Sequence, residues 1–397
     1  MLTRKIILPV IVVSQFCCTS LWFAGNGIID DLVRTFQLEV TALGHLTIAV
    51  QLGFIIGTLL FAIFSIADRF SPSKVFFTSA ILAALFNLCI LWESNNLITL
   101  LLFRFLTGFF LAGIYPVGMK IAADYYDNGL GKYLGFLVGA LVLGTAFPHV
   151  LKGITTGDQW RYVLMATSLL SLTGGLLMFS LVKDGPFRKE GSKLQLNACF
   201  QIFKNPDFKA ASFGYFGHMW ELYAFWAFVP IILKEYLQLH PSIDFNVAHL
   251  SFVVIGIGSL SCVASGYISQ HIGTRRTAFM SLLLSGICCL VAPLLFKVDS
   301  EYIFISFLLF WGMTVIADSP LLSALVAHNA PAAIKGTSLT IVTCIGFAIT
   351  IISIRLLNSL TAISNSGMMY MPLAIGPIFG LLALRKKKFN KKVLPSL

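Results

Sequence analysis

The sequence predicts an all-α membrane protein with twelve transmembrane helices, and three observations support this fold class. Hydrophobic residues make up 57% of the 397 residues and charged residues only 11%, whereas soluble domains carry roughly 25% charged residues. The mean hydropathy is +0.86. Twelve apolar stretches are long enough to cross about 30 Å of hydrocarbon as helices of roughly 20 residues each.

The longest polar interval divides these stretches into two sets of six. The first set is expected at about 6–27, 44–66, 75–93, 98–122, 133–153 and 160–183, and the second at about 210–234, 248–270, 277–296, 302–326, 337–359 and 369–385. The predicted organisation is an N-terminal six-helix bundle at 1–183, a cytoplasmic linker at 184–208, a C-terminal six-helix bundle at 209–385 and a basic cytoplasmic tail at 386–397.

The basic residues lie mostly on one side of the expected membrane. That side holds Arg4, Lys5, Arg69, Lys74, Lys132, the cluster from Lys183 to Lys209, Arg275, Arg276, Lys335 and the tail RKKKFNKK. The opposite loops hold only scattered bases. Because cytoplasmic loops are enriched in Lys and Arg, we expect both termini to be cytoplasmic in a bacterial-type inner membrane. The net charge of +11 then indicates topology and contact with anionic headgroups rather than nucleic-acid binding.

Several classes of site are not supported by the sequence. The eight cysteines fall mostly inside the apolar stretches without a paired CxxC spacing, so we expect neither disulfides nor a metal site. No Gly-rich phosphate loop and no nucleophile triad is present, so we expect no cofactor and no enzyme activity. The expected partners are the lipid bilayer, a small-molecule substrate and protons, and we expect a monomer.

Two tight cytoplasmic turns carry a weak internal repeat. ADRFSPSK follows the second stretch, and SQHIGTRR follows the eighth, about 200 residues later. Both resemble the loop signature of the major facilitator superfamily, G-x-x-x-D-R-x-G-x-R-R. The residues that match the signature, and that the resemblance implies for a cytoplasmic gate, are Asp68, Arg69, Lys74, Gly273, Arg275 and Arg276. The first copy lacks both glycines of the signature, and the second has Gln270 in place of the aspartate.

The resemblance covers nearly the whole chain and implies two pseudo-symmetric six-helix bundles around a central cavity that opens to alternate sides. RFLTGFFLAGIYP in the fourth stretch loosely resembles a further pattern of the superfamily, whereas the fifth stretch lacks the Gly-Pro pair of drug antiporters. The strings GHMWELYAFW and YPVGMKIAADY are similar to a bacterial branch grouped with nitrate and cyanate permeases. Nitrate carriers of this superfamily have arginines in the second and eighth spans, whereas these stretches contain none, so the resemblance disfavours nitrate as substrate.

Charged side chains inside the apolar stretches are rare, and each is a candidate functional residue. Glu221 lies in GYFGHMWELYAFWAFVPIIL with His218 one turn before it on the same face. We hypothesise that Glu221 binds a proton or a substrate amine and that His218 tunes it. The alternatives are a fixed tie from Glu221 to another helix and an ordinary buried imidazole for His218.

Three further charged residues have two interpretations each. Asp318 is the second candidate proton acceptor, or it satisfies backbone groups where Pro320 bends its helix. Arg104 could bind a substrate carboxylate, or it could brace polar groups of the first stretches. Arg355 lies near the outer end of its stretch and is expected to extend its charge to the interface.

Polar and aromatic residues could line the central cavity. Gln15, Thr19, Trp22 and Asn26 follow one another at helical spacing and are expected on one helix face. The further cavity candidates are Gln51, Tyr115, Trp220, Trp226, Trp311 and Thr314. Such residues offer hydrogen bonds and aromatic surface to an organic solute, but helix packing would also explain each of them.

The predicted function is proton-coupled secondary transport of a small organic solute, with energy supplied by ion or solute gradients. Within transport, symport of an organic anion and export of a drug-like or siderophore-like compound both stay open. The alternative from another class is a membrane receptor or sensor on the same fold that binds a solute without moving it. Flux into vesicles distinguishes the two.

Overall fold

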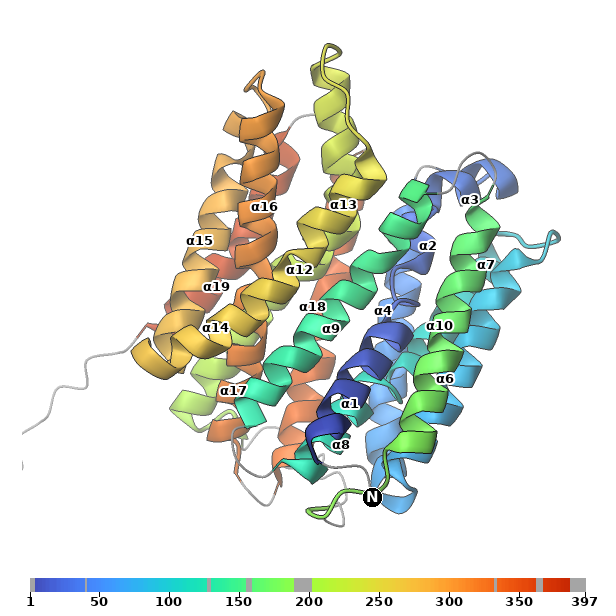
Figure 1. Cartoon of the computed structure of the whole chain (residues 1–397). Helices are drawn as coiled ribbons and strands as arrows, with labels where there is room; N and C mark the ends of the chain where they lie inside the picture. Colours follow the sequence, from blue (N-terminus) through green and yellow to red (C-terminus); the bar gives the residue numbers. More distant parts are fainter. Residues whose placement is uncertain are drawn as a thin grey trace, which may run out of the picture.

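Every regular element in the described part of the chain is a helix. The computed structural model describes residues 4–39, 41–126, 130–154, 159–188, 202–331, 334–361 and 367–385. Figure 1 shows the helices packed side by side, with the first half of the chain in blue to green and the second in yellow to red. Eleven helical segments of the described residues are long and apolar enough to cross a membrane, and the first stretch adds the shorter apolar helix Ile6–Thr19. The predicted all-α membrane fold is confirmed.

The helices follow the predicted stretches closely. The first half contains α1 (Arg4–Thr19), α2 (Ala24–Gly27), α3 (Ile29–Phe36), α4 (Ala42–Ile63), α5 (Ile66–Arg69), α6 (Pro72–Leu88), η1 (Cys89–Leu91), α7 (Leu97–Leu111), α8 (Tyr115–Tyr125), α9 (Leu130–Ile154) and α10 (Trp160–Leu181). The second half contains α12 (Pro206–Leu239), α13 (Val247–Gly256), α14 (Gly258–Ile272), α15 (Thr274–Leu295), α16 (Glu301–Ala317), α17 (Ser319–Asn329), α18 (Lys335–Leu360), η4 (Gly367–Ala374) and α19 (Ile375–Leu384).

Local sequence explains where several helices begin. Proline occupies one of the first two positions of α6, α8, α12 and α17, where its missing N–H removes no hydrogen bond. The side chains of Asn96, Asn205 and Asn246 accept hydrogen bonds from the first backbone N–H groups of α7, α12 and α13. These caps satisfy donors that have no acceptor within the helix.

Four of the predicted stretches are broken inside the membrane. The breaks lie at residues 20–23 between α1 and α2, at 112–114 between α7 and α8, at Ile257 between α13 and α14, and at Asp318 between α16 and α17. A break frees backbone carbonyl and N–H groups, and these are tolerated at membrane depth only where protein or water satisfies them. Discontinuous helices are typical of binding sites in transporter folds.

The most extensive contacts between the two halves are the pairs α4–α18 and α9–α13, and α14 packs on α9 beside them. On the α4–α18 pair, a Cβ atom at Gly44 would lie 2.5 Å from Cγ of Asn358, and Sγ of Cys344 lies 3.9 Å from the carbonyl oxygen of Ile55. On the α9–α13 pair, a Cβ atom at Gly153 of α9 would lie 2.3 Å from the ring of His249 in α13. Such close approach requires residues without large side chains.

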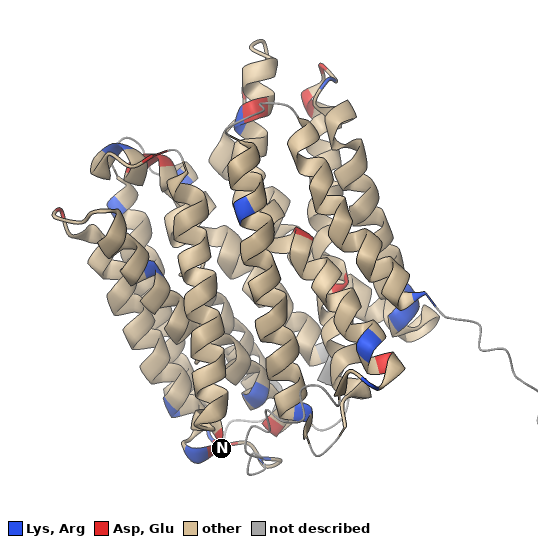
Figure 2. Ribbon diagram, turned by 180° about the vertical axis from the view of Figure 1, so that it is seen from behind, with Lys and Arg blue, Asp and Glu red and all other residues tan. Residues whose placement is uncertain are grey.

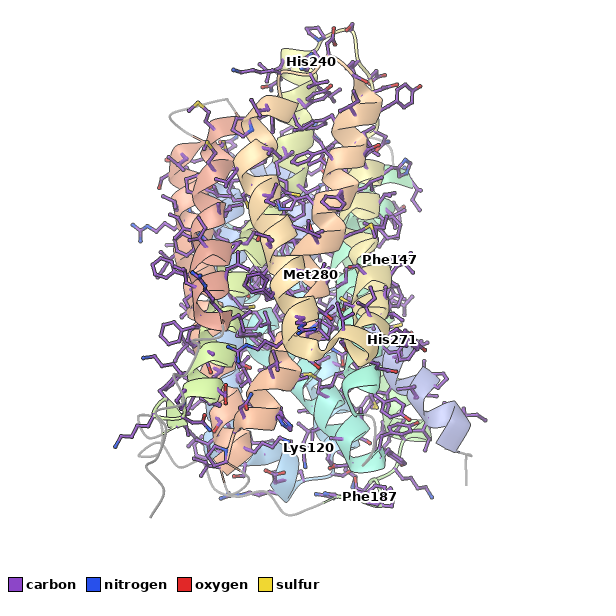
Figure 3. All side chains as sticks on the ribbon, turned by 90° about the vertical axis from the view of Figure 1, so that its left-hand side faces the viewer. Lys120, Phe147, Phe187, His240, His271 and Met280 are labelled. Atoms are coloured by element: carbon purple, nitrogen blue, oxygen red, sulfur yellow. The ribbon has the colours of Figure 1, made fainter. Side chains whose placement is uncertain are left out.

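Charged residues gather at the two ends of the helices and leave the middle of the molecule mostly apolar (Figure 2). Lys120 and Phe187 lie at one end and His240 at the opposite end (Figure 3). The orientation of these ends in the membrane and the boundaries of the two halves stay predictions. Linker residues 189–201 and tail residues 386–397 lie outside the described residues.

Candidate functional site

Glu221 is buried inside the second half of the molecule, with 1% of its surface exposed. Its carboxylate accepts hydrogen bonds from Nε1 of Trp311 at 2.7 Å, from Oγ of Ser285 at 2.9 Å and from Sγ of Cys289 at 3.3 Å. These donors belong to α15 and α16, so the carboxylate ties α12 to both helices. Charge-assisted hydrogen bonds of this kind are the strong ones in an interior.

His218 pairs with Asp318 rather than with Glu221. Its Nδ1 lies 2.8 Å from Oδ1 of Asp318, and both side chains are 1% exposed. The sequence predicted that His218 tunes Glu221. In the structure the two residues lie one helical turn apart on α12, and the imidazole pairs with Asp318 instead. The contact is a close approach of the two ionisable groups, and none of the four atoms Nδ1 and Nε2 of His218 and Oδ1 and Oδ2 of Asp318 makes a hydrogen bond within the described residues.

The break between α16 and α17 places Asp318 at this pair. α16 ends at Ala317, α17 begins at Ser319, and Pro320 lies in the first turn of α17. The backbone carbonyl of Asp318 accepts a hydrogen bond from N of Leu322 at 2.8 Å. The carboxylate of Asp318 contacts His218 and, within the described residues, no backbone group at the bend.

Arg104 braces the break in the first stretch. Its guanidinium donates hydrogen bonds to the carbonyl oxygens of Leu21, at 3.1 Å, and of Trp22, and its Nη1 lies 3.4 Å from Oδ1 of Asn87. Both carbonyls lie in the break at residues 20–23, and that of Leu21 also accepts a hydrogen bond from N of Ala24 at 3.4 Å. This is the bracing geometry of the two alternatives for Arg104, and it fixes the backbone on which Trp22 is mounted.

The polar stripe of the first stretch does not form one continuous helix face, because the helix ends at Thr19 and restarts at Ala24. Oγ1 of Thr19 donates to the carbonyl of Gln15 at 2.8 Å, and Nδ2 of Asn26 donates to Oγ1 of Thr47 at 2.8 Å. The first bond lies within α1, and the second joins α2 to α4, as the packing alternative for this stripe would have it.

Six aromatic side chains meet where the halves touch, and we call them the interface aromatic cluster: Trp22, Phe23, Phe54, Tyr223, Trp226 and Phe347. All are buried. The ring centroids of Trp22 and Phe347 lie 5.7 Å apart, those of Trp22 and Tyr223 also 5.7 Å, and those of Phe54 and Phe347 4.5 Å. Phe23 lies 6.4 Å from both Tyr223 and Trp226. Each of these contacts joins the first half to the second.

Several polar atoms in and near the cluster lack partners. Nε1 of Trp22, Nε1 of Trp226 and both amide atoms of Gln51 make no hydrogen bond within the described residues, and the amide of Gln15 makes none either. Gln51 lies one turn before Phe54 on α4, and Gln15 lies against Gly118 of α8. Buried polar groups are almost always hydrogen-bonded, so these four residues are the most informative of the cavity candidates.

The other cavity candidates lie apart from the cluster or serve neighbouring helices. Nε1 of Trp220 donates to the carbonyl of Pro372 in η4 at 3.0 Å, and Oγ1 of Thr314 bonds to its own helix at Phe310. Tyr115 opens α8 and is partly buried. Arg355 is exposed, as its position near a helix end led us to expect.

The matched loop residues form contacts within each half. Nζ of Lys120 lies 3.0 Å from Oδ1 of Asp68, while Arg275 donates to the carbonyl of Leu384 at 2.9 Å and lies 3.4 Å from Asp207. Gly273 has φ +92°, a conformation that favours glycine. The remaining matched residues, Arg69, Lys74 and Arg276, are exposed.

Sequence reasoning missed two buried polar residues and four of the six residues of the interface aromatic cluster. Oη of Tyr370 donates to Oε2 of Glu235 at 2.8 Å, and Asn87 bonds Oγ of Ser168 at 3.0 Å. Glu235 fell one residue beyond the expected stretch, although α12 continues to Leu239. Phe23, Phe54, Tyr223 and Phe347 carried no signal in a chain with 35 phenylalanines and 11 tyrosines. Among the described residues, no group of three or more His, Cys, Asp or Glu could hold a metal ion.

Solved structures share this arrangement of helices at low sequence identity. The proton:xylose symporter XylE matches with a TM-score of 0.72 and 14% identity over 96% of this chain and 94% of that one. A bacterial homologue of the human lysosomal transporter Spinster, in an inward-facing and unoccupied conformation, matches with a TM-score of 0.68 and 14% identity, over 96% of this chain and 95% of that one. These likenesses show the fold.

Curated relatives match parts of the chain. The uncharacterized transporter YgaY of Escherichia coli O157:H7 is 26% identical over 207 residues, which cover 49% of this chain and 50% of the relative. The niacin transporter NiaP of Acinetobacter baylyi is 32% identical over 162 residues, 34% of this chain and 36% of the relative. The chain thus spans about half or less of the length of these two relatives. The family model described as Major Facilitator Superfamily matches residues 11–354, and the chain is therefore a multi-pass membrane protein that belongs to the Major Facilitator Superfamily.

Proposed function

We propose that this protein is a secondary transporter that moves a small organic solute across the membrane by alternating access, coupled to protons. The carrying observation is the interface aromatic cluster, where buried unpartnered polar atoms lie at the contact between the two halves. A site at this contact can open to one side and then the other as the halves rock. The name of the relative NiaP, a niacin transporter, supports a small organic solute.

Proton coupling is proposed at the pair of His218 and Asp318, with Glu221 on the same helix as His218. An imidazole and a carboxylate 2.8 Å apart can together gain or lose one proton. Nε2 of His218 and Oδ2 of Asp318 have no hydrogen-bond partner within the described residues, so they are open to proton exchange. The break at Asp318 gives the carboxylate a backbone that can move relative to α12. Intramembrane ionisable residues commonly serve proton pathways.

The remaining predictions of the sequence enter the same proposal. We propose that the protein lies in a bacterial-type inner membrane with both termini cytoplasmic, as the basic residues indicate. We also propose that residues 1–183 and 209–385 form the two bundles and that the protein acts as a monomer. The gate is proposed at the two cytoplasmic turns, where Asp68 pairs with Lys120 and Arg275 pairs with Asp207.

The second candidate is a solute receptor that binds at the same cluster without transport. A receptor of this kind would keep its two halves together. The contacts along α4–α18 and α9–α13 favour the receptor only if these helices never separate. Within transport, the bracing role of Arg104 weakens symport of an organic anion, because the guanidinium that could bind a carboxylate is engaged. The direction of transport stays open.

Flux measured in vesicles tests the proposal. The purified protein is reconstituted into vesicles that contain a pH-sensitive dye. Radiolabelled niacin and a set of further metabolites are then added outside, with and without a pH gradient. We expect at least one solute to accumulate with the gradient and to change the internal pH. The control variant is Glu235→Gln, which changes another buried glutamate of α12. Solutes that bind and stabilise the protein but never cross the membrane would identify a receptor instead.

A further inference from the structure

We infer that the interface aromatic cluster binds an uncharged, planar aromatic or heteroaromatic solute that carries hydrogen-bond acceptors; this inference rests on the proposed function and names its substrate class. Three independent properties of the cluster lead to this class. They are the ring contacts across the halves, the kind of polar atoms left without partners, and the placement of the buried charges.

The ring contacts across the halves are of the kind that a planar ligand can replace. Trp22 stacks on Phe347 with an interplanar angle of 27° and a centroid distance of 5.7 Å. Phe54 lies 4.5 Å from Phe347. When the halves separate, these rings lose their partners, and a flat aromatic ring between them restores stacking from both sides. Aromatic pairs are worth more than their buried area alone.

The unpartnered polar atoms favour hydrogen-bond acceptors on the solute. The two indole nitrogens, Nε1 of Trp22 and Nε1 of Trp226, can only donate. The amide of Gln51 can donate and accept. Leaving such donors buried without an acceptor is unfavourable, so a ring nitrogen or carbonyl oxygen of the solute is the matching group. A sugar with many hydroxyl groups would need more polar partners than this cluster offers.

The buried Asp, Glu and Arg side chains of the described residues each have a partner within their own half, and the six side chains of the interface aromatic cluster carry no charge. The pairs and hydrogen bonds that hold the buried Asp, Glu and Arg side chains of the described residues are Asp31 with Arg34 and Lys152, Arg104 with Leu21 and Trp22, Asp124 with Lys120, Glu221 with Trp311, Glu235 with Tyr370, and Asp318 with His218. A charged solute between the halves would lack a counter-charge there, and burial of an unpaired charge is strongly unfavourable.

Four probes of nearly equal size test the inference on the unmodified protein in detergent. Benzamide is planar and neutral, benzoate is its anionic analogue, benzamidinium is its cationic analogue, and cyclohexanecarboxamide keeps the amide but replaces the flat ring. Dissociation constants are measured by calorimetry. We expect benzamide to bind tightest, with each of the other three weaker by about tenfold or more, a difference of about 1.4 kcal/mol. Tighter binding of benzoate, benzamidinium or cyclohexanecarboxamide, or binding of none of the four, overturns the inference.

A matched pair of tryptophan variants locates the binding site. Trp22→Phe keeps a ring in the cluster but removes the indole N–H, so benzamide binding is expected to weaken about threefold to tenfold. Trp160→Phe makes the same change at a buried tryptophan of a separate core beside Phe36, and binding is expected to stay unchanged. The thermal midpoints of both variants are measured first. Equal binding by both variants places the benzamide site elsewhere and overturns the assignment.

The outcomes separate this inference from the proposed function. Benzamide binding at Trp22 without flux of any solute would support the cluster as a binding site and contradict transport. Flux of a charged or sugar-like solute by a protein that ignores benzamide would support transport and contradict the inferred substrate class.

Discussion

Nδ1 of His218 lies 2.8 Å from Oδ1 of Asp318, and the two residues are 100 positions apart in the chain. The contact joins the long continuous helix α12 to the one point where the α16–α17 pair is interrupted. Both side chains are buried, so each is the nearest ionisable partner that the other has across these elements. Any change in the proton count of the pair alters the attraction that holds these elements together.

We expect Asp318→Asn to abolish the dependence of transport on a pH gradient while leaving exchange of solute across the membrane. The amide of asparagine is neutral and does not bind or release a proton as a carboxylate does, so position 318 no longer carries a proton acceptor. Counterflow of labelled solute and gradient-driven uptake are compared in vesicles, with Glu235→Gln as the control because Glu235 is a buried acid held by Tyr370. Gradient-driven uptake at the normal rate in Asp318→Asn would remove this residue from the coupling.

We expect Glu221→Leu to lower the free energy of unfolding by about 2 kcal/mol, because Nε1 of Trp311 is left buried without an acceptor. Glu221→Gln keeps one carbonyl oxygen as an acceptor and should lose less. The midpoint of thermal unfolding in detergent measures both.

The same pair of variants separates the two roles of Glu221. If Glu221 is only a tie between α12 and its neighbours, Glu221→Gln retains pH-driven transport. If Glu221 shares in coupling, the variant is stable but loses the pH dependence. A Glu221→Leu protein as stable as the unmodified one would contradict the structural contribution of its hydrogen bonds.

We expect Arg104→Met to destabilise the protein by about 3 kcal/mol, because two buried carbonyl oxygens lose a charged donor. The matched control is Arg355→Met, which removes an exposed arginine and should change stability by less than about 0.5 kcal/mol. Unfolding midpoints in detergent provide the comparison. Equal midpoints for the two variants would show that residues 20–23 hold their turn without Arg104.

We expect transport to stop when the halves are linked at one end. Nζ of Lys234 lies 2.5 Å from Oδ2 of Asp30, and both side chains are exposed, so the ion pair itself contributes at most about 1 kcal/mol. Cysteines at these two positions, joined by a short thiol-reactive linker, should block flux. The pair of Glu93 and Arg161, 3.1 Å apart within one half, is the control, and its linkage should leave flux unchanged. Undiminished flux through the Asp30–Lys234 linkage would contradict separation of the halves at this end.

The transmembrane fold could be predicted from the sequence because the length of an apolar stretch is a local property. The second stretch was expected at about 44–66, and the structure has the continuous helix α4 at Ala42–Ile63. The breaks were harder to predict, because residues 20–23 are as apolar as the helix before them. Their turn depends on Arg104, which lies more than 80 positions away in the chain. Pro320 signalled a bend near Asp318, but proline alone does not decide between a kink and an interruption.

The candidate site could be predicted only in part, because partners depend on how the helices pack. Glu221 and Asp318 were found since charge is rare in apolar stretches. Helical spacing put His218 beside Glu221, whereas tertiary packing brought Asp318 to the imidazole instead. Phe54 and Phe347 could not be singled out, since nothing local separates an aromatic ring in an interface from one in a core.

The tight approach of the halves at Gly44 and Gly153 makes the balance between conformational states sensitive to single methyl groups. A Cβ atom at either position would overlap the side chain of Asn358 or His249, so an alanine there forces that side chain to move, but only while these helices are in contact. In a state in which these helices have moved apart, the overlap is absent. Gly44→Ala and Gly153→Ala would therefore shift the population of molecules away from the arrangement described, with no change to a solute-binding residue and no new contact in the other state.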